Sequence, residues 1–275
     1  MTTIQLGSVV FNGFATSGWV FSGLTDWFGQ VDNKVPVTQR PQAHGAFSVS
    51  RALRSSRAVS FNAAYLGDDS VEVESAVDEL AAVGADGPVL MTVTTDAGVS
   101  WRWVTVETSS FTDNHGMSHG LVAVDCVARD PRRYEDAPWL VTGPPVPGLG
   151  LVWPVIWPAI WPGGGSSGRI DLVNRGRASS APVFRLTGGF ESAVITNTVT
   201  GARIGFGLAL PPTSTVVIDV AERRATVDGQ SDVSRFLQWR EWSEVPAGMT
   251  VPYQFDVSGA VGSPTLEGRV CSAWW

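Results

Sequence analysis

The chain has 275 residues, of which 44% are hydrophobic and 16% are charged, and its formal net charge is −7. This length and apolar content are enough for two domains with sizeable cores. The acidic balance and the scattered basic residues argue against a nucleic-acid-binding protein, which needs clustered lysine and arginine. The sequence has no run of about 18 apolar residues and no basic leader, so we expect neither a membrane span nor a secretory signal.

Residues 1–142 are expected to form a β domain that contains one helix. A hairpin is predicted where β-branched and aromatic residues of 89–95 and 99–106 flank a turn that contains glycine. The apolar run 121–128 predicts a further strand, which ends before a proline.

The one helix is predicted over about 69–83. Asp69 has the side chain of an N-cap, and Glu72 follows at the spacing of a capping box. Gly84 is placed to end the helix. The apolar residues that recur at helical spacing are Val73, Ala76, Val77 and Leu80.

Residues 143–168 form a Pro/Gly-rich connector, and we place the domain boundary there. The connector contains three Trp-Pro pairs spaced by four, and prolines at this density exclude a regular helix. Side chains alternate along an extended chain, so the tryptophans share one apolar face and the isoleucines the other. We expect one face to contact a partner; the alternative is that the strip folds back between its own two domains. The residues of this predicted assembly contact are Trp153, Ile156, Trp157, Ile160 and Trp161.

Residues 169–275 contain short apolar runs separated by Gly, Ser and Pro, and no long helical pattern. This spacing is typical of a β-sandwich or jelly roll. A hairpin is predicted from 216–219 and 224–227.

No set of residues makes a case for an enzyme or for a bound cofactor. Residues 164–168 match G-x-S-x-G, but a strand follows them where a nucleophile elbow requires a helix. His115 and His119 are four residues apart, yet they lie in a Gly-flanked loop without a third ligand nearby, so we expect no metal. Cys126 and Cys271 each lie in an apolar run and are expected to be two reduced thiols; the alternative is a disulfide, which their separation in the sequence neither forbids nor supports.

The twelve tryptophans are the most unusual feature of the composition. Trp239 and Trp242 lie in the second domain, and one interpretation is an aromatic platform for a sugar ring. The other interpretation is packing in the core or at an interface.

Several segments, in their order along the chain, resemble the distal tail protein family of long-tailed (siphovirus-type) bacteriophages. The order of these segments carries the resemblance, since none of them is specific alone. The segments are ARDPRRY (128–134), GRIDLVNRGRASSAPVFRLTG (168–188), ITNTVTGARI (195–204), VVIDVAERRATVDG (216–229) and VPAGMTVPYQF (245–255).

The resemblance implies a structural virion protein at the tail tip, assembled in the host cytoplasm. It also implies that the chain, like other members of this family, forms a hexameric ring that joins the tail tube to the baseplate hub. DNA would pass through the lumen without being bound. The N-terminal domain would form the ring belt, and the C-terminal domain a galectin-like sandwich. The acidic cluster at 68–74 fits a lumen that repels phosphate, or it only caps the helix. The alternative function is a carbohydrate-binding adhesin or accessory minor tail protein that contacts the host surface.

Overall fold

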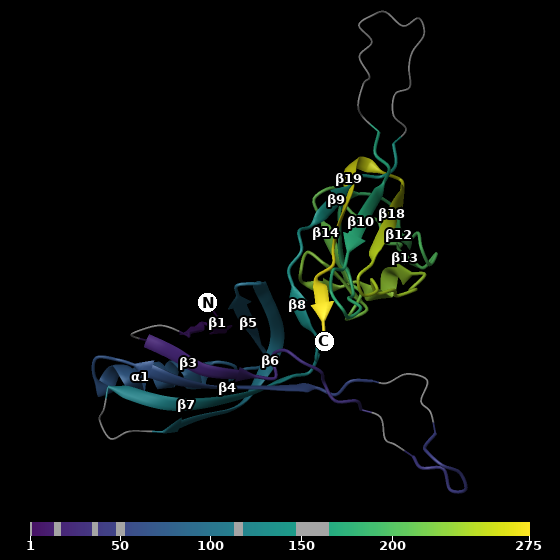
Figure 1. Cartoon of the computed structure of the whole chain (residues 1–275). Coiled ribbons are helices and arrows are strands. Elements are labelled where there is room, and N and C mark those ends of the chain that lie inside the picture. Colours follow the sequence, from purple (N-terminus) through teal and green to yellow (C-terminus); the bar gives the residue numbers. More distant parts are fainter. Residues whose placement is uncertain (1, 14–17, 35–37, 48–52, 113–117, 147–164) are drawn as a thin grey trace, which may run out of the picture. The chain divides into compact units, whose positions relative to one another are not determined.

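The computed structural model describes residues 2–13, 18–34, 38–47, 53–112, 118–146 and 165–275. They are mainly β-strands with one α-helix, as predicted (Figure 1). The chain divides into two compact units, unit 1 (Met1–Glu135 with Trp274–Trp275) and unit 2 (Asp136–Ala273). The predicted connector at 143–168 stays a prediction, because residues 147–164 lie outside the described part.

Seven strands of unit 1 form a closed mixed barrel. They are β1 (Thr3–Leu6), β2 (Val9–Asn12), β3 (Gly18–Thr25), β4 (Arg57–Leu66), β5 (Val89–Thr95), β6 (Gly98–Thr112) and β7 (His119–Ala128). Their order is β6-β5-β1-β2-β3-β4-β7, and β7 pairs back onto β6. The β2–β3 pair is parallel and the others are antiparallel. β8 (Arg133–Glu135) and β20 (Ser272–Trp274) extend the sheet beyond β6.

The barrel closes because β6 is long enough to pair with two strands in succession. Its first part pairs with β5, its second part pairs with β7, and the register shifts between Val106 and Thr108. A shift of this kind bends a strand and increases its twist. Alternate residues of each strand then point into one core. Large side chains of this core include Ile4, Leu6, Phe11, Phe61, Met91, Val93 and Val124.

The helix α1 (Ser70–Ala82) begins and ends as its sequence predicts. Asp69 accepts a hydrogen bond from the Glu72 amide at 2.8 Å, and the Glu72 carboxylate accepts one from the Asp68 amide at 2.8 Å. Gly84 follows the helix at φ +78°, a conformation that glycine adopts without strain. Asp69 and Glu72 of the predicted acidic cluster thus cap the helix. Within the described residues, no helix has the length and apolar character needed to cross a bilayer.

Unit 2 consists of two antiparallel sheets that share one hydrophobic core. The first sheet is β10 (Arg169–Val173), β18 (Thr250–Ser258), β12 (Ser192–Asn197), β13 (Arg203–Phe206) and β17 (Leu237–Gln238), in that order. The second is β16 (Ser231–Asp232), β15 (Arg224–Val227), β14 (Thr215–Asp219), β11 (Val183–Gly189), β19 (Val261–Arg269) and β9 (Leu140–Thr142). The predicted hairpin is the β14–β15 pair. The galectin-like or jelly-roll topology stays a prediction.

A buried asparagine stabilises the turn that follows β10 through its side-chain hydrogen bonds. Asn174 is 0% exposed, and its Nδ2 donates to the carbonyls of Ala178 at 2.7 Å and Val245 at 3.1 Å. Its Oδ1 accepts from the amides of Gly176 at 3.0 Å and Ala273 at 3.2 Å. A Cβ at position 176 would lie 1.8 Å from the Ala273 carbonyl oxygen, so only glycine fits there. The Asn-x-Gly of the second domain is therefore a structural device.

Candidate functional surfaces

One part of the barrel, the sheet β3-β4-β7-β6, has an unpaired edge on each side. β3 pairs with β2 only at Val20, so residues 21–25 have strand partners on one side only within the described residues. On the opposite side, residues 108–112 of β6 pair only with β7 in the described part of the chain. Unpaired amides and carbonyls at such edges are ready to pair with another strand.

The two edges lie in the same stretch of the sheet, because cross-strand pairs connect them. One row of paired residues runs Ser22, Asn62, Ala123 and Ser110. The next row runs Val20, Ala64, Leu121 and Thr112. These two rows line a shallow hollow of about 420 Å³, and none of its lining residues is charged. The sheet thus combines two free edges with an uncharged face of mostly small side chains.

An arginine lies inside the barrel without an acceptor. Arg102 is 1% exposed, and none of its guanidinium nitrogens has a hydrogen-bond partner among the described residues. Its guanidinium carbon lies 4.5 Å from the centre of the Trp27 ring, a cation–π contact. Burial, followed by the charges of Arg57 and Arg133, lowers the pKa of Arg102 to about 9.

The segment ARDPRRY forms its own polar network after β7. Asp130 accepts hydrogen bonds from Arg132 Nε at 3.0 Å and from the Tyr134 hydroxyl at 2.6 Å. Burial raises the pKa of Asp130, but the hydrogen bonds from Arg132 and Tyr134 outweigh it and hold this pKa below its usual range. Arg57 donates to the Pro131 carbonyl at 3.2 Å. These contacts fix the chain where it leaves the barrel.

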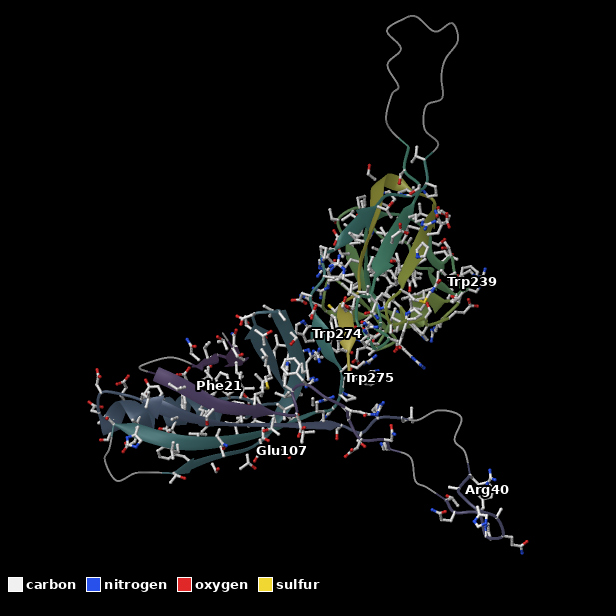
Figure 2. The ribbon with its side chains drawn as sticks, viewed as in Figure 1. Phe21, Arg40, Glu107, Trp239, Trp274 and Trp275 are labelled. Carbon is white, nitrogen blue, oxygen red and sulfur yellow. The ribbon has the colours of Figure 1, made fainter. Side chains whose placement is uncertain are left out.

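The two tryptophans proposed as a sugar platform differ in exposure. Trp242 is half-buried and packs against the core of unit 2. Trp239 is 47% exposed, and Figure 2 labels it at the margin of this unit. A Cβ at Gly205 would lie 2.6 Å from Trp239 Cε3, so the indole ring lies against β13 where that strand has no side chain. The guanidinium carbon of Arg203 is 5.2 Å from the ring centre.

Other predicted sites fall partly outside the described residues. The five residues of the predicted assembly contact do so: Trp153, Ile156, Trp157, Ile160 and Trp161. His115 does too, whereas His119 begins β7. Among the described residues, no group of three or more His, Cys, Asp or Glu is placed to hold a metal. Cys126 and Cys271 are free thiols, as predicted.

The two sheet edges and Arg102 are the features that the sequence did not reveal. The run of small and uncharged residues at 108–112, TSSFT, is the one signal for the β6 edge. It contains no charge or proline, the residues with which edge strands are usually protected.

No protein-family model and no curated protein matches the chain, but its fold matches solved structures. One is the Dit protein (gp 19.1) of phage SPP1, described as a paradigm of the hub adsorption apparatus of phages that infect Gram-positive hosts. The TM-score is 0.66, with 11% identity and 100% of both chains covered. Chains of the phage P2 baseplate, in its activated conformation with Ca and with Sr, match with TM-scores of 0.55 and 0.54. Both are 11% identical, and they cover 98% of this chain and 98% and 97% of their own. The predicted resemblance to distal tail proteins is confirmed at the level of the fold.

Proposed function

We propose that the chain is a structural protein of a phage tail tip, a distal tail ring that joins the tail tube to the baseplate hub. The full-length similarity of its fold to the Dit protein of phage SPP1 and to phage P2 baseplate chains supports a place in the tail. The observation that carries the ring is the pair of free edges on opposite sides of the sheet β3-β4-β7-β6.

Two different edges on opposite sides of one sheet favour head-to-tail pairing between copies. Such a contact is heterologous, and it generates a closed ring when the rotation between copies closes. Residues 21–25 of one copy would add to residues 108–112 of the next, so that one sheet continues around the ring. The number of copies, six, comes from the resemblance to the distal tail proteins.

We also propose that DNA passes through the lumen of this ring, and the uncharged hollow supports this part of the proposal. A surface that conducts a duplex must not bind it, and phosphate binding depends on clustered lysine and arginine. The rows that end at Ser110 and Thr112 carry neither. We assign this face to the lumen, in place of the acidic cluster, of which two members cap α1.

The test places charges at both edges of the sheet. Ser22 and Ser110 share a row at its two ends, with two strands between them, so in one copy they stand roughly 14 Å apart. In the paired ring, Ser22 of one copy would lie next to Ser110 of another. We expect the double variant S22K/S110K to remain monomeric through like-charge repulsion, whereas S22K/S110E assembles like the wild type.

Mass in solution by light scattering, followed by negative-stain images, measures the outcome. Circular dichroism of both variants shows that the fold is unchanged. A wild type that is monomeric at every concentration contradicts the ring. Equal assembly of the two variants contradicts the pairing of these edges, and an image of the virion without the protein at the tail tip contradicts the proposed function itself.

A further inference from the structure

Trp239 combines exposure with an unfavourable backbone. It is one of four non-glycine residues at positive φ in the described part of the chain, with φ +44°, and 47% of it is exposed. This region of φ is uncommon for residues with a side chain and is a marked outlier for a bulky one. A strained residue persists where the surrounding structure holds it, and such residues cluster at functional sites. A smaller residue, or glycine, would satisfy this turn at a lower cost in free energy.

The neighbourhood holds the indole ring in one position. Gly205 provides the space against β13, and the guanidinium carbon of Arg203 lies over the ring, 5.2 Å from its centre. Glu241 accepts a hydrogen bond from the Arg203 amide at 2.8 Å and donates its own amide to the Arg203 carbonyl at 3.1 Å. The Glu241 carboxylate is therefore held at the Arg203 backbone, and the Arg203 guanidinium contacts the ring itself.

We propose that Trp239, Arg203 and Glu241 form a binding site for a pyranose ring of a glycan. The flat indole provides the apolar surface on which the C–H face of a sugar stacks. Arg203 offers N–H donors and the Glu241 carboxylate offers acceptors, and sugar hydroxyls require both. The site is independent of the ring proposal, because it lies in unit 2 and needs no second copy.

A sugar fits this surface better than a protein does. Gln238, Arg240 and Glu241, the immediate neighbours in sequence, are all exposed and polar. A protein interface buries about 800 Å² on each partner around an apolar centre, whereas a single ring with a polar rim matches one sugar unit.

The test uses the whole chain and three neutral probes: tetramers of β-1,4-linked N-acetylglucosamine, of α-1,4-linked glucose and of β-1,4-linked galactose. Binding is measured by saturation-transfer NMR and titration. We expect saturable binding of at least one tetramer, at least a tenfold loss in W239G and a several-fold loss in R203M. Trp103 is 57% exposed in unit 1, so W103A is the matched control and should bind like the wild type.

The variant W239G also separates binding from folding. Glycine adopts positive φ freely, so its unfolding midpoint should equal or exceed that of the wild type while glycan binding is lost. Absence of saturable binding by all three tetramers overturns the proposal, as does unchanged binding in W239G. Loss of tail assembly in W239G without loss of glycan binding assigns the residue to a protein contact and also overturns it.

Discussion

Arg102 in unit 1 and Asn174 in unit 2 are both buried polar side chains, but their surroundings differ. Asn174 is hydrogen-bonded through both ends of its amide, to carbonyls and amides of five other residues. Arg102 has only the face of Trp27 and no acceptor among the described residues. A buried polar group stabilises a fold when it is satisfied and costs free energy when it is not.

The difference suggests what each side chain does for its unit. Asn174 ties together segments that are far apart in sequence, and unit 2 needs it. Arg102 opposes the stability of the barrel, which nevertheless has a full hydrophobic core around it. The first three of the four predictions below test this contrast, and all are ordered from the largest expected effect on stability to the smallest.

Replacing Asn174 by leucine should have the largest effect on stability. The substitution keeps the volume but removes the Asn174 partner of the Gly176 and Ala273 amides and of the Ala178 carbonyl, so we expect a loss of roughly 3 kcal/mol or more. Denaturant unfolding of the full chain measures it. Asn12 is the matched control, because its Oδ1 is already unpaired among the described residues. N12L should change stability far less, and equal losses in the two variants would contradict the contrast.

Replacing Arg102 by methionine should instead stabilise the barrel. Methionine keeps the length of the side chain and removes a buried charge without an acceptor, so we expect a gain of about 1–3 kcal/mol at pH 7. A loss of stability in R102M, measured by the same unfolding experiment, would show that the guanidinium is satisfied.

The effect of Arg102 should also depend on pH. Its pKa is about 9 in the fold, well below the ordinary value of an arginine, so below pH 9 both the folded and the unfolded state are protonated and the free-energy cost of burial is constant. Above pH 9 the folded state loses the proton first, and the wild type gains stability relative to R102M as the pH rises. Burial raises the pKa of the Cys126 thiol to about 12, which destabilises the fold in part of this range. The difference between the wild type and R102M cancels that contribution, and a flat difference from pH 8 to 11 would contradict the prediction.

Replacing the three tryptophans of the connector by alanine should leave the stability of both units almost unchanged. Trp153, Trp157 and Trp161 are predicted to bury an apolar face against a partner, so W153A/W157A/W161A should fold but fail to enter tails. Calorimetry measures the folding and complementation of a phage that lacks the gene measures the assembly. Normal assembly, or a large loss of stability, would place the strip within its own chain instead.

Local patterns made part of this molecule predictable. The cap at Asp69, the apolar spacing after it and Gly84 define α1, and the Gly turn defines the β5–β6 hairpin. These signals depend on a few neighbouring residues, so residue propensity and hydrophobic periodicity are enough to predict them.

The features that the sequence did not predict depend on pairing between strands that lie far apart along the chain. In the segment Trp101-Arg102-Trp103, hydrophobicity favours burying the tryptophans and exposing the arginine. The structure does the opposite, with Arg102 at 1% exposure and Trp103 at 57%. The register of β6 with β5 pairs Met91, which is fully buried, with Arg102 and so sets which face points inward. The same distant pairings leave the two edges of the sheet free, and the uncharged run at 108–112 is the one local pattern that indicates either of them.

The hydrogen bonds of Asn174 have a consequence for how the chain is made. All seven barrel strands have been synthesised once residue 128 is added, whereas three partners of Asn174 lie 71, 72 and 99 residues beyond it. At about 5–20 residues per second, a ribosome needs roughly 5–20 s to deliver Ala273 after Asn174. During that interval the barrel can fold, while the amide of Asn174 still lacks native partners. Unit 2 is therefore expected to fold last, and its unfinished strands are the part of the nascent chain that a chaperone would need to protect.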